Sequence, residues 1–168
     1  LGFEKDGITY DFKEKLKIKG VKFKGFIRVL KDLRIIKDEE ELKLLKEGVK
    51  KTDEIYKCVI SFLKEKDIFK NQELTELKLR GFLISKIFEL GGEGESFPAI
   101  IASGKNSSIP HWESSNSKIK INAPLLIDTG IIWKGYCTDF TRTVYLGKPD
   151  SEFKKIYEIV KTAWYKEN

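Results

Sequence analysis

Apolar residues recur at intervals of three and four positions between Asp38 and Lys64, and this periodicity predicts one long amphipathic helix. Asp38 and Glu41 have the spacing of a capping box, in which each side chain accepts a hydrogen bond from the other residue's backbone N–H. The predicted inner face of this helix is Leu42, Leu45, Val49, Thr52, Tyr56, Val59 and Leu63.

A second helix is predicted after a polar connection, with Asn71 as its candidate cap and the pair Gly91-Gly92 as its end. A glycine inside a helix costs about 1 kcal/mol, so Gly81 is expected where this helix packs closely against a strand. A third helix is predicted to begin at Ser151. The predicted inner face of the second helix is Leu74, Leu77, Gly81, Phe82, Ser85 and Phe88.

Two runs of β-branched and aromatic residues between Pro124 and Gly147 predict an antiparallel hairpin across the segment 133–135. Each arm carries one aspartate, Asp128 and Asp139. Residues that face each other in a hairpin have a constant sum of residue numbers. When the loop has an even number of residues, this sum is odd. The residue numbers of the two aspartates also add up to an odd number, so both carboxylates are expected on one face of the hairpin. If the loop is centred between residues 133 and 134, their Cβ atoms lie about 5 Å apart.

Two carboxylates at that distance need a proton or a cation between them. A pair of divalent metals about 3.5–4 Å apart suits this geometry. The spacing alone leaves one alternative open, in which the two aspartates are exposed on their strands and never meet.

The only histidine in the chain, His111, ends a polar loop that follows a short apolar strand predicted at Phe97–Ala102. This loop leads back towards the hairpin, and the ring of Pro110 restricts the backbone before His111. The imidazole is therefore a candidate to hydrogen-bond whatever lies above the aspartates, and a plain surface histidine is the alternative. Thr141 is predicted on the strand face that Asp139 occupies.

The first part of the chain predicts only short elements, a helix over Thr9–Ile18, a strand over Val21–Lys24 and a helix over Phe26–Leu33. These short elements are too little to bury a core of their own. We therefore predict a domain boundary after residue 36, with 1–36 and 37–168 as separate parts.

Residues 1–37 hold 11 basic and 5 acidic side chains and so account for the whole net charge of +6. Such a charge permits a nucleic-acid surface. However, only four of the 32 basic residues are arginine, which phosphate- and base-binding sites favour for its planar fork. A solvated lysine face is the better interpretation, and tight, salt-dependent binding of DNA or RNA would contradict it.

The sequence contains no signal-peptide pattern and no apolar run near the roughly 20 residues of a membrane span. Its two cysteines are too few for a disulfide framework. We expect a cytoplasmic protein without membrane or nucleic-acid partners. Because it begins at Leu1, has no methionine and ends inside a helical pattern, we interpret it as a fragment.

Several segments together resemble a known family. In order, ASGKNSSIPH, LLIDTG, KGYCTDFTRTV and FKKIYEIV resemble the first half of the catalytic domain of the Xaa-Pro dipeptidase and aminopeptidase P group. This group belongs to the methionine-aminopeptidase-like, pita-bread metallopeptidases of family M24. The resemblance implies an α/β (α+β) fold with helices packed on a curved antiparallel sheet. Residues 37–168 would form the first half of that domain, and residues 1–36 the end of a creatinase-like N-terminal domain with its linker.

The resemblance also implies a site. Asp128 and Asp139 would ligate two divalent cations, usually Mn²⁺ and sometimes Co²⁺, Fe²⁺ or Zn²⁺, with Asp139 bridging both. His111 would bind substrate or transfer a proton without being a ligand, and Thr141 would support a ligand. In this family a water that bridges the metals hydrolyses the bond before proline in short peptides, and a homodimer is implied.

The sequence departs from the family at two points. Trp112 follows the histidine where the family usually has glycine, so the substrate pocket or the substrate preference is expected to differ. The family's remaining ligands, one histidine and two glutamates, come from the second half of the domain, and this chain has no second histidine. We therefore expect these 168 residues alone to bind metal weakly and to hydrolyse nothing.

Two further alternatives stay open. The chain could be a pita-bread module that has lost catalysis and binds peptides or a protein partner, although the presence of Asp128, Asp139 and His111 argues against it. It could also be a methionine aminopeptidase-like enzyme, against which residues 1–33 and Pro110 argue.

Overall fold

The computed structural model describes residues 1–5, 7–16, 18–65 and 73–167. The chain divides into two compact units, Leu1–Leu42 and Lys43–Asn168. The division falls within the first turn of α3, which spans Glu39–Glu65, a little beyond the boundary predicted after residue 36. The candidate cap Asn71 lies outside the described residues.

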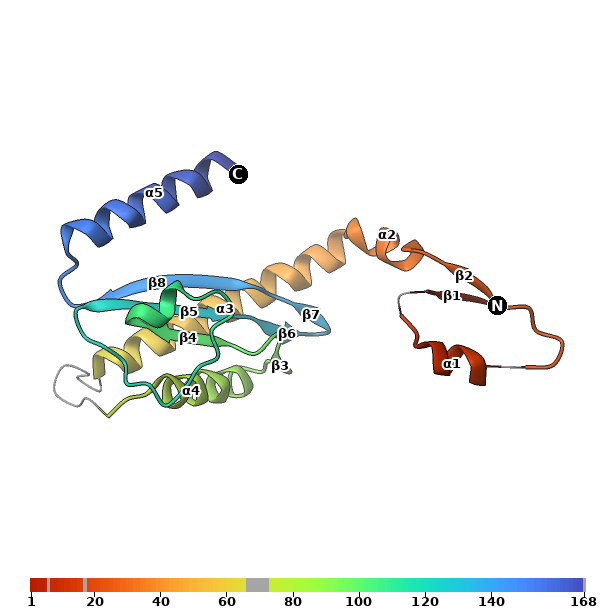
Figure 1. The fold of residues 1–168 in the computed structure, drawn as a ribbon, viewed down its shortest axis with the longest axis horizontal. Coiled ribbons are helices and arrows are strands. Elements are labelled where there is room, and N and C mark those ends of the chain that lie inside the picture. Colours follow the sequence, from red (N-terminus) through yellow and green to blue (C-terminus); the bar gives the residue numbers. More distant parts are fainter. Residues whose placement is uncertain (6, 17, 66–72, 168) are drawn as a thin grey trace. The chain divides into compact units, whose positions relative to one another are not determined.

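The first unit contains two short strands that pair in parallel, together with two short helices (Figure 1). None of the described side chains among residues 1–42 is buried, which agrees with the prediction that this segment has no core of its own. One strand was missed by the sequence pattern, and the other elements lie up to a few residues from their predicted places. The elements are β1 (Gly2–Glu4), α1 (Tyr10–Lys15), β2 (Lys24–Phe26) and α2 (Val29–Ile35).

The long helix α3 confirms its prediction. The Asp38 N–H donates to Glu41 Oε2 and the Glu41 N–H donates to Asp38 Oδ1, both at 2.9 Å, so the capping box is present. The inner face agrees only in part with the expected one, because Leu42 and Val49 are exposed. The buried residues of α3 are Gly48, Thr52, Ile55, Val59 and Leu63.

Helix α4 spans Glu76–Glu89, and its inner face is not the predicted one. Leu77 and Phe88 are exposed, and a Cβ built on Gly81 would meet no atom within 4 Å. The prediction failed because apolar residues occur all around this helix, so periodicity alone did not select a face. The buried residues are Glu76, Leu79, Leu83 and Ile87.

Gly48 of α3 is the glycine that packs closely against a strand segment. A Cβ at this position would lie 3.0 Å from Thr138 Cγ2 and 3.2 Å from Trp133 Cβ. Close packing of helix on sheet was therefore expected correctly but assigned to the wrong helix.

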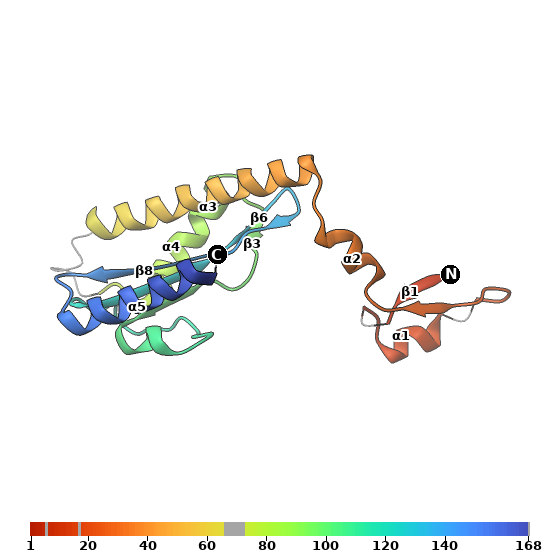
Figure 2. The same ribbon diagram turned by 90° about the horizontal axis from the view of Figure 1, so that it is seen from above.

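The second unit contains two antiparallel three-stranded sheets, and sequence patterns placed their longer strands correctly in outline. Helices α3 and α4 pack against the sheet and share one buried apolar cluster with it (Figures 1 and 2). Strand order is β4-β5-β8 in one three-stranded sheet and β3-β6-β7 in the other. The elements are β3 (Gly94–Glu95), β4 (Ile100–Ser103), the 3₁₀ helix η1 (Gly104–Ser108), β5 (Ala123–Thr129), β6 (Ile131–Trp133), β7 (Tyr136–Cys137), β8 (Phe140–Leu146) and α5 (Ser151–Glu167).

The hairpin turns at Lys134-Gly135, where both residues have positive φ, 49° and 80°. Positive φ at both central positions is typical of the type I′ turn, which suits the twist of a hairpin and favours glycine. The turn is therefore centred one residue later than predicted, and Asp128 pairs with Thr141 instead of Asp139. The expectation that the two aspartates are directly opposite was wrong for this reason.

Candidate metal and substrate site

Three of the residues predicted for the site line one hollow of the second unit, of about 610 Å³. They are His111, Asp128 and Asp139, and the same hollow has an apolar part that includes Phe97 and Trp112. The structure thus brings together side chains that come from well-separated segments of the chain.

Strand β5 places Asp128 by simple alternation. Ile127 and Thr129 are buried on the face that packs on the helices, so Asp128 between them points to the other face. In the ladder Asp128 pairs with Ile100 of β4 and with Thr141 of β8. The hydroxyl of Thr141 donates to Asp128 Oδ1 at 2.5 Å, which fixes the orientation of that carboxylate.

Asp139 lies at the break between β7 and β8, and the preceding residue fixes its backbone. The buried Thr138 Oγ1 lies 2.8 Å from Thr52 Oγ1 of α3 and accepts a hydrogen bond from the Ile131 N–H at 2.9 Å. Gly130 faces this point, where a Cβ would lie 1.9 Å from the carbonyl oxygen of Thr138. Only glycine allows the two backbone segments to approach so closely.

The donor atoms of the hollow fit a hard divalent cation. Neither Asp128 nor Asp139 has an ion-pair partner within the described ranges, and Arg80, which lines the same hollow, is bonded to Glu95 at 2.8 and 3.1 Å. Carboxylate oxygens are the ligands that Mn²⁺, Mg²⁺ and Ca²⁺ prefer. In the part of the chain that the structure describes, no cluster of three or more potential metal-ligating side chains occurs. Two carboxylates supply only some of the ligands that a divalent cation needs, so further donors are required to complete a metal site.

His111 is exposed at the hollow and has a left-handed backbone conformation, with φ of 54°. Its loop lies on the side of the sheet away from α3 (Figure 2). The sequence indicated that this loop returns to the hairpin but did not indicate what holds it there.

Glu76 is the residue that sequence reasoning missed. Its side chain is 0% exposed and accepts hydrogen bonds from the loop on both sides of His111. Burial acts to raise the pKa of the Glu76 carboxyl, but hydrogen bonds from Asn106, Trp112 and the backbone of Ser103 and Ser115 outweigh it and hold the pKa below its ordinary value. A glutamate directly after a helix cap is common in sequences, so no signal distinguished this one.

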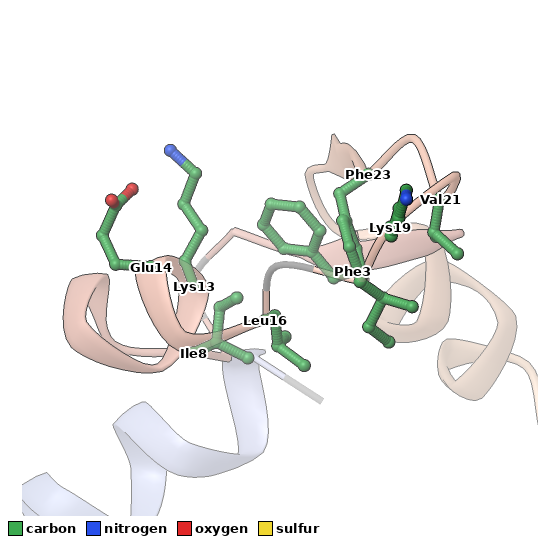
Figure 3. A pocket seen from close by; sticks show the side chains of 9 residues that line it. Phe3, Ile8, Lys13, Glu14, Leu16, Lys19, Val21 and Phe23 are labelled. Atoms are coloured by element: carbon green, nitrogen blue, oxygen red, sulfur yellow. The ribbon is translucent and has the colours of Figure 1, made fainter.

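A second hollow, of about 480 Å³, lies in the first unit (Figure 3). Its lining is mostly apolar and includes Phe3, Leu16 and Phe23, with Lys13 and Glu14 beside them. With one carboxylate and no histidine in its lining, it lacks the donor set of the first hollow.

The sequence profile of metallopeptidase family M24 matches residues 43–166, which cover the whole hollow and most of the second unit. The chain belongs to metallopeptidase family M24. This finding confirms the resemblance that the four sequence segments indicated.

Two solved structures share the fold of this chain. The chain aligns with an Xaa-Pro dipeptidase from Bacillus anthracis with a TM-score of 0.86 and 32% identity, over 96% of this chain and 44% of that one. It aligns with the prolidase from Pyrococcus furiosus with a TM-score of 0.83 and 32% identity, over 96% and 46%. The predicted class is therefore confirmed: helices on an antiparallel sheet, matching about half of a pita-bread prolidase.

Among curated M24 relatives, an Xaa-Pro dipeptidase from Pyrococcus horikoshii is 34% identical over 97% of this chain and 45% of its own length. The chain thus spans less than half the length of the relatives that it matches. The roles of Asp128, Asp139, His111 and Thr141 stay predictions.

Among the described residues, no helix has both the length and the apolarity needed to cross a membrane.

Proposed function

We propose that the whole protein hydrolyses the peptide bond before proline in short peptides, as an Xaa-Pro dipeptidase or aminopeptidase P with two divalent cations. The observation that carries this proposal is the hollow that Asp128, Asp139 and His111 line together, where no cationic side chain of the described residues is bonded to either aspartate. Membership of M24 and relatives named Xaa-Pro dipeptidase support it.

Each residue has a proposed task. Asp128, oriented by Thr141, and Asp139 hold the cations, for which Mn²⁺ suits the oxygen donors better than a soft metal. Bound divalent metals supply an acidified water and stabilise negative charge at the peptide carbonyl. His111 binds the substrate or moves a proton at the open side of the hollow, and Trp112 forms part of its apolar wall.

Two wider features belong to the same proposal. We place the protein in the cytoplasm, which its two free thiols, Cys58 and Cys137, support. We also propose a homodimer, as the family resemblance implies.

The test is hydrolysis by the whole protein with Mn²⁺, using Xaa-Pro dipeptides, longer peptides with proline second, and matched peptides with alanine in place of proline. Cleavage limited to the proline series, and abolished by Asp128→Asn, is expected. Cleavage of Met-Ala peptides instead would favour the methionine aminopeptidase alternative, and binding of proline peptides without any cleavage would favour a binding module.

The 168 residues alone provide a further arm of the same test. Because two carboxylates are too few to hold two catalytic cations, we expect weak Mn²⁺ binding and no hydrolysis from this chain. Xaa-Pro hydrolysis by the purified 168-residue chain would contradict the proposal that its site is incomplete.

A further inference from the structure

Glu76 is a buried carboxylate whose hydrogen-bond donors among the described residues are all neutral. It is 0% exposed, and five hydrogen bonds reach its two oxygens, each from a backbone N–H, an amide, an indole or a hydroxyl. Burial of a charge is unfavourable unless hydrogen bonds replace the lost water. This complete set of donors shows that the loop is folded around the carboxylate.

The two oxygens of Glu76 hold two different parts of that loop. Oε1 accepts from the Ser103 N–H and from Asn106 Nδ2, both at 2.9 Å, before His111 in the chain. Oε2 accepts from Trp112 Nε1 at 2.9 Å and from the N–H and the hydroxyl of Ser115 at 3.1 Å, after His111. His111 is therefore the middle of a loop whose two sides converge on one side chain.

Backbone hydrogen bonds also join the loop to the first turn of α4. Glu76 is the first residue of α4, and the N–H groups of Glu76 and Leu77 donate to the carbonyl oxygens of Ser117 and Ser115 at 3.0 Å. These N–H groups have no partner within the helix. Because Leu79 and Leu83 of the same helix are fully buried, the loop is joined to the core of the unit.

We propose that Glu76 is a positioning residue of the site, which holds His111 and the Trp112 indole in place beside Asp128 and Asp139. Glu76 does not line the hollow itself, whereas His111 and Trp112 do. The hydrogen bond to Trp112 Nε1 fixes the plane of the indole, so that its ring is a constant apolar wall for an apolar substrate residue. This role for His111 and Trp112 rests on the proposed function.

The test uses the 168-residue chain and the variant Glu76→Gln, which keeps the shape of the side chain but presents an NH₂ group to the loop's donors. Glu89→Gln, at an exposed position of the same helix, is the matched control. We expect amide hydrogen exchange over residues 103–116 to accelerate about tenfold in Glu76→Gln and to stay within about twofold of wild type in the control. Exchange in β5 should not change.

Two results would overturn the proposal: unchanged exchange over residues 103–116, or an equal acceleration in β5 and α3, which would show a general loss of stability. If Glu76→Gln does not fold, the variant Trp112→Phe tests the proposal instead, because it removes the indole donor and leaves the Glu76 carboxylate in place. Faster exchange confined to the segment after His111 is then expected, and wild-type exchange there would contradict the proposal.

A second readout follows the imidazole directly, because the chain has one histidine and so one set of imidazole proton signals. Bound Mn²⁺ should broaden these signals in the wild type, and Glu76→Gln should reduce the broadening at equal Mn²⁺ occupancy. Equal broadening in both proteins would overturn the positioning role. No broadening in the wild type would contradict the proposed metal site, while the exchange measurement would still decide the role of Glu76.

Discussion

At the scale of single residues, the carboxylate of Asp128 depends on one hydrogen bond. Thr141 Oγ1 donates to Asp128 Oδ1, and the ladder places the two residues directly opposite each other. A hydroxyl that orients a ligand typically contributes 10–100-fold to metal affinity.

Thr141→Val, which removes this hydroxyl and keeps the shape of the side chain, should weaken Mn²⁺ binding about tenfold. Isothermal titration of the whole protein measures the change. Thr143→Val, on the same strand, is the matched control and should bind Mn²⁺ like the wild type. An unchanged affinity in Thr141→Val would remove Thr141 from the proposed site.

The buried Glu76 predicts how stability depends on pH. Its pKa in the folded protein lies below the ordinary value of 4.5. A carboxyl with a lowered folded pKa stabilises the protein fully above its unfolded pKa, and this contribution is lost as pH falls through the folded pKa. The stabilising effect of Glu76 should therefore be present at neutral pH and decline below about pH 4.5.

Amide hydrogen exchange over residues 103–116 at several pH values checks this. At pH 7, Glu76→Gln should lower the free energy of opening this loop by about 1.4 kcal/mol, which corresponds to the tenfold faster exchange, because buried donors of the loop lose their acceptor. The difference from wild type should narrow below pH 4.5. A difference that stays constant down to pH 3, or an equal effect of Glu89→Gln, would contradict the assignment.

Sequence patterns singled out His111, Asp128 and Asp139, which the structure brings to one hollow, but they did not indicate what supports the loop of His111. Each of the three residues lies in a local segment with its own pattern. Glu76 was missed because its partners come from residues 103–115, and only the folded loop brings them together.

At the scale of elements, one helix was predicted well and the other was not. The face of α3 is marked by a polar side and a capping box. Helix α4 has apolar residues all around, so its buried face is decided by tertiary packing, which a sequence period does not contain. The predicted register of the hairpin was wrong because the turn is centred one residue later than expected. The conformation of the turn at Lys134-Gly135 determines this register.

The two helix glycines give opposite predictions. Gly81→Ala fills open space in α4 and should raise the free energy of unfolding by about 1 kcal/mol through helix propensity. Gly48→Leu forces a side chain against Thr138 and Trp133 and should lower it by about 2 kcal/mol. Thermal and urea unfolding of both variants measure these effects. Stabilisation by Gly48→Leu would show that α3 does not pack as described.

At the scale of the whole molecule, the two units differ in how much they bury. The second unit holds the apolar cluster of α3, α4 and the sheet, whereas the described residues of 1–42 include no buried side chain. The sequence predicted this contrast because the first segment contains only short elements, whereas the second contains a long periodic helix and a hairpin.

Hydrogen exchange should show the contrast directly. Amides of β1, β2 and α2 should exchange at least about tenfold faster than those of β5 and the buried turns of α3, because few buried contacts oppose local opening. Mass spectrometry of the 168-residue chain measures both sets in one sample. Equal protection in the two units would contradict the lack of a core in the first.

Gly130 has no functional group, yet it limits which sequences this fold can accept. Any side chain there would collide with the Thr138 carbonyl, one residue before Asp139. In a saturation-mutagenesis library of the whole protein, selected for the proposed peptidase activity, every substitution at Gly130 should be depleted as strongly as substitutions of the two aspartates. The list of tolerated substitutions would thus group Gly130 with the proposed site residues, although Gly130 has no side chain that could contact a substrate.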